Sequence, residues 1–178
     1  MGAVSSPKSV QFFTSIIFRD NSCMENAEKD IREAIGSILD RTAPTSFCYT
    51  RYYEKEMGSN LSRIFLLFEP LFNREQLPEI KLKTNSIEAS ISSEGNRTVN
   101  IDPGYISLEN IVLATTKGYA HRIYLGSGIF ADLTLIYRNS TYKPLEWTYP
   151  DYGSEEIIAI FKRWRNILKE KIRTCEDG

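Results

Sequence analysis

Hydrophobic and polar positions follow two different periods in the first part of the chain. Residues 10–18 form a mainly apolar run rich in Phe and Ile, which is typical of a buried strand. Apolar residues then recur at spacings of three and four and predict an amphipathic helix. This helix would begin at the capping box of Ser22 and end before Pro44, with Ile38 and Leu39 on its apolar stripe.

The pattern then predicts two strands followed by a second helix. Residues 45–53 are aromatic and β-prone, and residues 63–68 are apolar enough for a central strand. Asn73 and the nearby Pro78 suit the start of a helix, and Gly95 suits the position just past its end. One helical stripe carries the apolar positions between them, so this helix should pack on the sheet.

A fourth strand over residues 98–101 would stop at the turn of residues 102–104, Asp-Pro-Gly. The order strand, helix, strand, strand, helix, strand is that of the ferredoxin-like arrangement, in which two helices cover one face of an antiparallel sheet. The sequence therefore predicts an α+β fold with a ferredoxin-like βαββαβ core.

The last third of the chain predicts an added hairpin and helix. Residues 108–116 fit a short helix or a strand equally well. Residues 122–125 and 129–137 alternate around Gly-Ser-Gly, which indicates a β-hairpin. Residues 142–147 suit an edge strand, and a final amphipathic helix begins after Ser154.

The hairpin pattern also predicts which residues face each other. A three-residue loop at 126–128 places Arg122 opposite Asp132. That pair is either an ordinary cross-strand ion pair or part of a polar site, and the sequence leaves both open. The face with Arg122 also carries Tyr124, Asp132 and Thr134. The other face is predicted as core and carries Ile123, Leu125, Ile129, Ala131, Leu133 and Leu135.

Composition indicates one water-soluble domain over residues 1–178, with an ordered core at about 9–173. The 22 basic and 23 acidic residues give a net charge of −1, which argues against nucleic acid or a membrane surface as partner. Three widely spaced cysteines suit a reducing cytosol, and no apolar run reaches the about 20 residues of a membrane span. With a single histidine, the chain lacks the common zinc motifs.

Two nucleotide motifs are excluded. No Gly-Lys-Ser/Thr sequence is present, so a P-loop is absent. The stretch from Gly126 to Ala131 matches the dinucleotide fingerprint, but that motif requires a helix after the glycines. Here a period-two pattern follows, and it predicts a strand.

A short basic cluster before the hairpin is the best candidate for a site. Lys117, His121 and Arg122 could hold a phosphate or carboxylate, with Asp132 orienting the arginine. The aromatic segment 147–152 could line the pocket or merely cover the sheet edge. The predicted ligand-binding residues are Lys117, Arg122, Asp132, Tyr124, Tyr149 and Tyr152.

His121 and Asp102 are the candidate catalytic residues. Histidine can exchange protons near neutral pH, but His121 has the parity of the apolar face, where a structural role is the alternative. Asp102 is a candidate acid–base or metal group, although its Asp-Pro-Gly setting also suits a plain turn.

Two further polar groups have a simple explanation beside a functional one. Glu54 and Glu56 could hold a hard cation, and solvated loop charges explain them as well. Lys81, Asn85 and Glu88 share one helical face, which a solvated helix surface explains.

Several long, ordered motifs resemble a known family. They lie at residues 52–58, 81–88, 99–105, 113–126 and 147–152. Together they resemble the prokaryotic family known as domain of unknown function 4416. The resemblance implies a bacterial or archaeal cytosolic protein and supplies no mechanism.

We therefore expect a protein that binds a small anionic or phosphorylated ligand. Whether it is an enzyme, which cofactor it uses and its oligomeric state stay open. The alternatives are a non-catalytic protein-interaction module and an RNA-binding domain that uses sheet aromatics, for which the usual basic excess is missing.

Overall fold

The computed structural model describes residues 2–176, which form a mixed α/β fold with nine strands and four α-helices. The helices are α1 (Asn21–Ile35), α2 (Glu54–Met57), α3 (Leu77–Ser90), preceded by a 3-10 turn η1 (Arg74–Gln76), and α4 (Glu155–Glu176). The strands are β1 (Gln11–Phe18), β2 (Ile38–Arg41), β3 (Thr45–Ser46), β4 (Ser62–Phe68), β5 (Val99–Ile106), β6 (Asn110–Thr115), β7 (Arg122–Gly126), β8 (Ile129–Arg138) and β9 (Thr141–Pro144).

All nine strands belong to one antiparallel sheet. Its main path runs β2–β4–β1–β5–β6–β8–β7, while β3 pairs with β4 and β9 pairs with β8. β1 lies between β4 and β5 and is buried along its whole length, because both of its edges are paired and both of its faces are covered. None of the helices in the described residues is long and apolar enough to cross a membrane.

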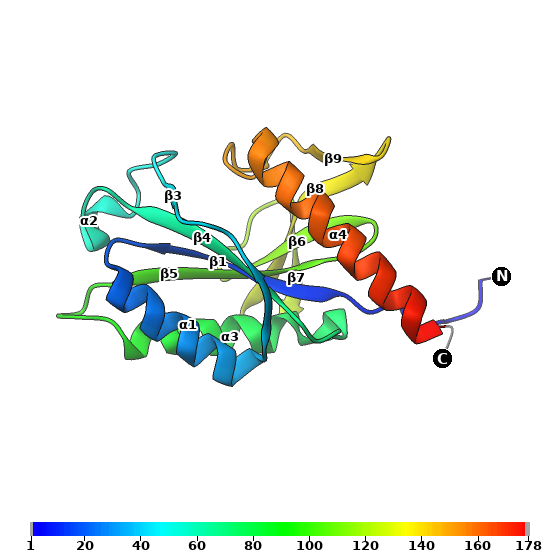
Figure 1. Ribbon diagram of the computed structural model, residues 1–178, viewed down its shortest axis with the longest axis horizontal. Helices are drawn as coiled ribbons and strands as arrows, with labels where there is room; N and C mark the ends of the chain where they lie inside the picture. Colours follow the sequence, from blue (N-terminus) through cyan, green and yellow to red (C-terminus); the bar gives the residue numbers. More distant parts are fainter. Residues whose placement is uncertain (1, 177–178) are drawn as a thin grey trace.

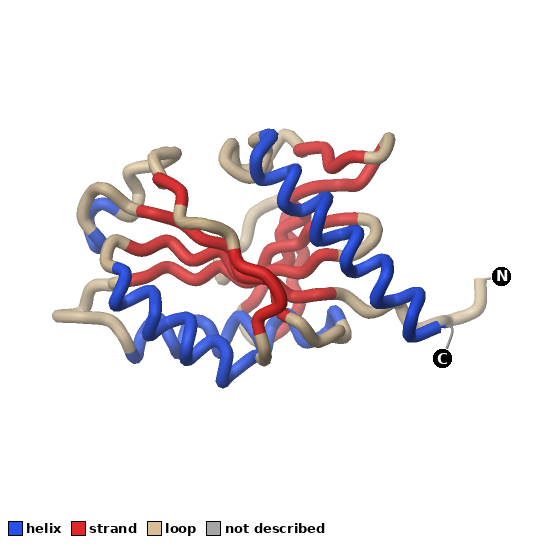
Figure 2. The backbone as a smooth tube through the Cα atoms, in the orientation of Figure 1, coloured by secondary structure: helices blue, strands red, loops and turns tan. Residues whose placement is uncertain are grey.

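Helices cover the two faces of the sheet from opposite sides (Figures 1 and 2). α1 and α3 pack on one face, around Phe12, Ile16 and Leu66. The long helix α4 packs on the other face, where Phe161 and Trp164 contact Phe13. Alternate residues of β1 thus serve two separate cores, as the period of a strand requires.

The first helix ends earlier than the apolar spacing predicts. α1 stops at Ile35 because Gly36 follows with φ 142°, a backbone conformation that favours glycine. Ile38 and Leu39, expected on the helix stripe, belong instead to β2, where Ile38 pairs with Phe68. The helix prediction for these two residues is wrong, since an adjacent apolar pair near a glycine fits a strand equally well.

The predicted strand over residues 45–53 is also wrong beyond its first two residues. β3 ends at Ser46, and the chain then leaves the sheet for a loop that leads into α2. Its aromatic residues do not alternate between two sheet faces. Phe47 packs against Tyr49 and Tyr53, with ring centroids 6.0 Å apart in each pair.

The Asp-Pro-Gly segment is not the turn that the sequence suggests. β5 runs straight through Asp102, Pro103 and Gly104 to Ile106. The main-chain groups of Ile101 point away from β1 and bond side chains of α3. Pro103, two residues later, points the same way along the strand, so its nitrogen faces the side where no strand needs an N–H donor. Residues 110–115, which fitted a helix or a strand, form β6.

The hairpin of β7 and β8 has the predicted register, with Arg122 opposite Asp132. Its loop is shorter than predicted, because Gly126 pairs with Ile129 and a bulge in β7 restores the register. A second bulge leaves Thr134 of β8 without a partner in β6. The alternation of β8 side chains shifts by one residue there, so odd-numbered residues before and after the bulge lie on opposite faces of the sheet. Ile129 therefore joins the core under α1 and α3, whereas Leu135 joins the core under α4.

The single core face predicted for the hairpin is wrong for a second reason. β7 is at the edge of the sheet, where β8 is its one paired neighbour among the described residues. Ile123 and Leu125 are 70% and 40% exposed. Alternating apolar residues on an edge strand do not establish that their face is buried, since burial depends on what packs against that face.

Candidate functional site

The sheet divides into a fork between β5 and β6. These strands pair only from Gly104 to Ile106, opposite Leu113 to Ile111. Before Gly104, β5 pairs with β1 alone, and beyond Leu113, β6 pairs with β8 alone. Gly104 lies where the strands part, and a Cβ atom there would be 2.6 Å from the Val112 carbonyl oxygen. Only glycine allows the two backbones to approach so closely.

Side chains of α3 satisfy the main chain that the fork leaves unpaired. The Ile101 N–H donates to Glu88 Oε1 at 2.5 Å, and Lys81 Nζ donates to the Ile101 carbonyl at 3.1 Å. Lys81 is buried, and its ammonium also contacts Asp102 Oδ1 at 3.3 Å. The helix face of Lys81 and Glu88 is therefore not a plain solvated surface, because it completes the edge of β5.

The fork opens into a cleft of about 470 Å³, a volume that suits a small molecule. Its floor comes from β1 and β4, and its sides come from α3 with β5 and from the end of β6 with β7 and β8. Two loops complete it, residues 47–53 and 149–152. Six aromatic side chains line it: Phe47, Tyr49, Tyr52, Tyr53, Tyr149 and Tyr152.

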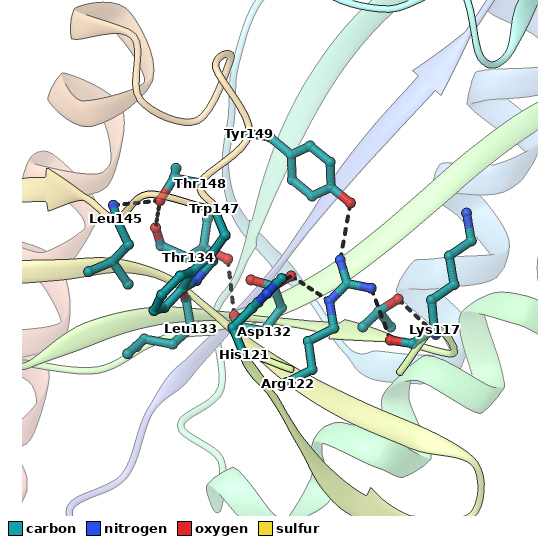
Figure 3. Close-up of polar contacts among 11 residues, drawn as sticks. Lys117, His121, Arg122, Asp132, Leu133, Thr134, Leu145, Trp147, Thr148 and Tyr149 are labelled. Carbon is teal, nitrogen blue, oxygen red and sulfur yellow. Dashed lines mark hydrogen bonds and ion pairs between the residues drawn. The ribbon is translucent and has the colours of Figure 1, made fainter. Parts of the chain in front are cut away.

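Arg122 and Asp132 form a buried ion pair at one side of the cleft (Figure 3). Arg122 Nε donates to Asp132 Oδ2 at 2.8 Å, and each side chain is only 4% exposed. The guanidinium also donates to the Lys117 carbonyl at 2.9 Å and to the Tyr149 hydroxyl at 3.2 Å. Arg122 is thus held in place by three protein groups.

Lys117 differs from the other basic residues of the cleft. Its ammonium bonds only the Tyr52 hydroxyl, at 3.2 Å, and lies 4.6 Å from the centroid of the Tyr52 ring. Within residues 2–176 it has no ionic partner. The other basic lining residues are all paired with carboxylates: Arg63 with Asp151, Lys81 with Asp102, Arg97 with Glu56, and Arg122 with Asp132.

The sequence reading missed Arg63, which lies at the floor of the cleft. It is buried, pairs with Asp151, and is surrounded by the rings of Phe47, Phe65 and Tyr152. Its Nε has no hydrogen-bond partner among the described residues. One signal was available, because Arg63 is the only charged residue in the strand SRIFLLF.

A chain of polar contacts runs along the α3 side of the cleft. Arg97 donates to Asn100 Oδ1 at 2.8 Å, and the Asn100 amide donates to Asp102 Oδ2 at 2.6 Å. Asp102 therefore accepts from both Asn100 and Lys81. Its surroundings are those of an anchored carboxylate, which the turn interpretation did not foresee.

Burial changes the proton affinity of three groups in the cleft. Desolvation raises the pKa of Glu88 to about 7, with Lys81 acting in the opposite direction. Burial also raises the pKa of Tyr53 and of Tyr152 above the usual value for a phenol. Both tyrosines thus stay neutral at physiological pH, whereas Glu88 is partly protonated there.

Two of the sequence-predicted residues lie outside the cleft. His121 is stacked between Tyr119 and Trp147, at centroid distances of 6.1 Å and 5.0 Å, and its Nε2 lies 3.6 Å from Asp132 Oδ2. Trp147 in turn donates to the Leu133 carbonyl at 2.8 Å. Tyr124 is 60% exposed and packs on Phe130. The remaining predicted residues line the cleft: Asp102, Lys117, Arg122, Asp132, Tyr149 and Tyr152.

The candidate cation ligands Glu54 and Glu56 do not form a metal site in this structure. Glu56 Oε2 bonds Arg97 Nε at 2.6 Å instead. Within the described part of the chain, no group of three or more His, Cys, Asp or Glu side chains is arranged to hold a metal ion.

Comparison with known proteins decides the family. The model of a family described as a domain of unknown function (DUF4416) matches residues 8–168. The chain belongs to this family. No curated protein and no solved structure matches the chain. For this DUF4416 member, function must therefore be argued from the cleft itself.

Proposed function

We propose that this DUF4416 protein binds a small anionic or phosphorylated molecule in the cleft between β5 and β6. The observation that carries the proposal is the unpaired ammonium of Lys117, the one basic lining residue without a carboxylate partner in residues 2–176. A phosphate or carboxylate would complete its interactions, while the fixed guanidinium of Arg122 adds positive charge nearby.

The aromatic lining supports a ligand with a flat, apolar part. Tyr52 and Tyr149 are 57% and 49% exposed, so both rings are available for stacking. Two of Arg122's five N–H donors also lack a partner among the described residues and can bond the anion. Asp102 and Glu88 supply carboxyl groups for proton transfer, so the cleft also suits an enzyme.

Three further features belong to the same proposal. The order β2–β4–β1–β5 with α1 and α3 on one face supports a ferredoxin-like core, to which β6–β9 and α4 are added. A sheet that joins all nine strands supports a single domain. The prokaryotic and cytoplasmic assignment is supported by the family resemblance and by three free cysteines.

Thermal unfolding with simple anions tests the proposal. Inorganic phosphate, phenyl phosphate and citrate would be titrated against the wild type, Lys117→Ala and Lys83→Ala. Lys83 is the matched control, because it lies on α3 outside the cleft and pairs with Glu79. We expect at least one anion at 100 times its Kd to raise the Tm of the wild type and of Lys83→Ala by roughly 5–10 °C.

Lys117→Ala should lose most of this rise. An equal rise in Lys117→Ala would contradict the proposed anion position. No rise with any anion, together with a stable dimer in sedimentation, would favour the alternative, a protein-interaction module. The observation in favour of that alternative is the exposed apolar edge strand β7, which carries Ile123 and Leu125.

A further inference from the structure

The charges of the cleft leave one carboxyl group as well as one ammonium without an ionic partner. Asp102, Asp132 and Asp151 each contact a basic side chain. Glu88 forms no ion pair among residues 2–176, and its hydrogen bond is to the main-chain N–H of Ile101. The described residues donate nothing to the other carboxyl oxygen of Glu88, so it is free to bond a ligand.

The groups around Glu88 cannot neutralise it. Lys81 Nζ, on the same helix, is already shared by the Ile101 carbonyl and Asp102. Arg97 is engaged by Glu56 and Asn100. Asp102 from β5 and the neutral Tyr53 from the loop before α2 add no positive charge. Every nearby cation thus has its own carboxylate, and none is left for Glu88.

The raised pKa of Glu88 fits this arrangement. Desolvation outweighs the attraction of Lys81 and Arg97, and Asp102 repels a further negative charge. The protein's own groups therefore do not fully compensate the charge of ionised Glu88. A ligand group that carries positive charge would supply the missing compensation.

We propose that Glu88, with Asp102 beside it, forms a cation-binding subsite of the cleft, so that the ligand is amphoteric and carries a protonated amine as well as its anionic group. This inference rests on the proposed function and deepens it. Lys117, on the β6 side of the fork, would take the anion, and Glu88, on the α3 side, would take the amine. Two carboxylates, one of them bonded to a main-chain N–H, suit an N–H donor better than a divalent metal ion, which needs more oxygen ligands.

Three related probes separate the two halves of the ligand. Phenyl phosphate carries the anion alone, tyramine carries the ammonium alone, and tyramine phosphate carries both on the same ring. Calorimetric titration at pH 8, where Glu88 is mostly ionised, would compare the wild type with Glu88→Gln and Glu79→Gln. Glu79 is the matched control, since it lies on α3 outside the cleft.

In the wild type and in Glu79→Gln we expect tyramine phosphate to bind at least about tenfold more tightly than phenyl phosphate. Glu88→Gln should remove this advantage. It should bind phenyl phosphate at least as tightly as the wild type, because a negative charge is removed from the cleft, and this binding also shows that the variant is folded. Asp102→Asn should reduce the advantage partly.

Proton release gives a second measurement. Because the amine favours ionised Glu88, binding of tyramine phosphate at pH 7 should release about half a proton, read from titrations in two buffers of different ionisation enthalpy. Glu88→Gln should release much less, because only the phosphate of the probe, whose second pKa is about 6, then contributes.

The outcomes distinguish the two proposals. Equal affinity for phenyl phosphate and tyramine phosphate, with Lys117-dependent binding of both, overturns the amine subsite and leaves the anion site in place. Binding of tyramine that requires Glu88, without binding of phenyl phosphate, supports the subsite and overturns the anion proposal. Binding of none of the three probes overturns both.

Discussion

At the scale of single residues, the cleft is defined by which charges have partners. Arg122 is almost fully buried and bonds a carboxylate, a carbonyl and a phenol. Removing Asp132 would leave an uncompensated buried charge, so variants of this pair report on stability rather than on binding. Lys117 and Glu88 are the residues whose substitution addresses binding, because the fold does not use their charges in an ion pair.

Glu88→Gln should change the pH dependence of stability. The ordinary pKa of the group is 4.5, and in the folded protein it is about 7, so the folded state binds the proton more tightly. The stability from protonated Glu88 is fully present below pH 4.5 and is lost as the pH rises through 7. The amide oxygen of Gln can keep the hydrogen bond from Ile101, and the amide never ionises. We therefore expect the free energy of unfolding of Glu88→Gln to exceed that of the wild type by roughly 1–3 kcal/mol at pH 8.5.

Urea unfolding at pH 5 and pH 8.5 measures this difference. At pH 5 the variant and the wild type should differ much less, because Glu88 is then mostly protonated. A gap between the two proteins that is the same at both pH values would contradict the raised pKa.

Part of the site can be read from the sequence. Alternation around Gly126 and Gly128 places Arg122 opposite Asp132, and helical spacing places Lys81 and Glu88 on one face. The sequence does not show that this face meets the open edge of β5, since that depends on where two distant strands stop pairing. It also does not bring Arg63 to the cleft, because its partner Asp151 is 88 residues away.

At the scale of elements, the cleft exists because β5 and β6 pair over only three residues. Gly104 marks the end of that pairing, and side chains of α3 replace the missing strand along the remainder of β5. The sequence could not predict this, because Asp-Pro-Gly is a turn signal when neighbours are ignored. In the sheet the proline has its nitrogen at the unpaired edge, and the glycine provides the close approach.

Gly104→Ala should destabilise the protein by about 1–3 kcal/mol. The new methyl group would lie 2.6 Å from the Val112 carbonyl oxygen and 2.8 Å from Phe13, so backbone or core must shift. Gly153→Ala is the control, because its methyl group would meet neighbours only at 3.5 Å or more. Equal denaturation midpoints for the two variants would contradict the close packing at the fork.

At the scale of the whole molecule, one sheet separates two cores that depend on different helices. The core under α1 and α3 comes mainly from the first two thirds of the chain, and β8 adds Ile129 to it. The core under α4 joins β1 and β4 to the C-terminal segment. Phe161 of α4 stacks on Tyr152 at 6.1 Å, and Tyr152 lines the cleft, so α4 supports the site from behind.

Phe161→Ala should cost about 3–5 kcal/mol of unfolding free energy, because the ring is fully buried among Phe13, Phe65 and Trp164. Lys162 is the next residue of α4 and is exposed. Lys162→Ala should change the free energy of unfolding by less than about 0.5 kcal/mol. Urea denaturation measures both. A small loss for Phe161→Ala would mean that α4 contributes little to the second core.

The two tryptophans sit in contrasting places, and this gives the protein a built-in optical probe. Trp164 is fully buried under α4, whereas Trp147 is 38% exposed and stacks on His121. Their fluorescence should therefore separate into a short-wavelength component that acrylamide cannot quench and a long-wavelength component that it can. Tyr149, which bonds Arg122, is only two residues from Trp147. Emission from Trp147 would thus follow events at the cleft without any added label.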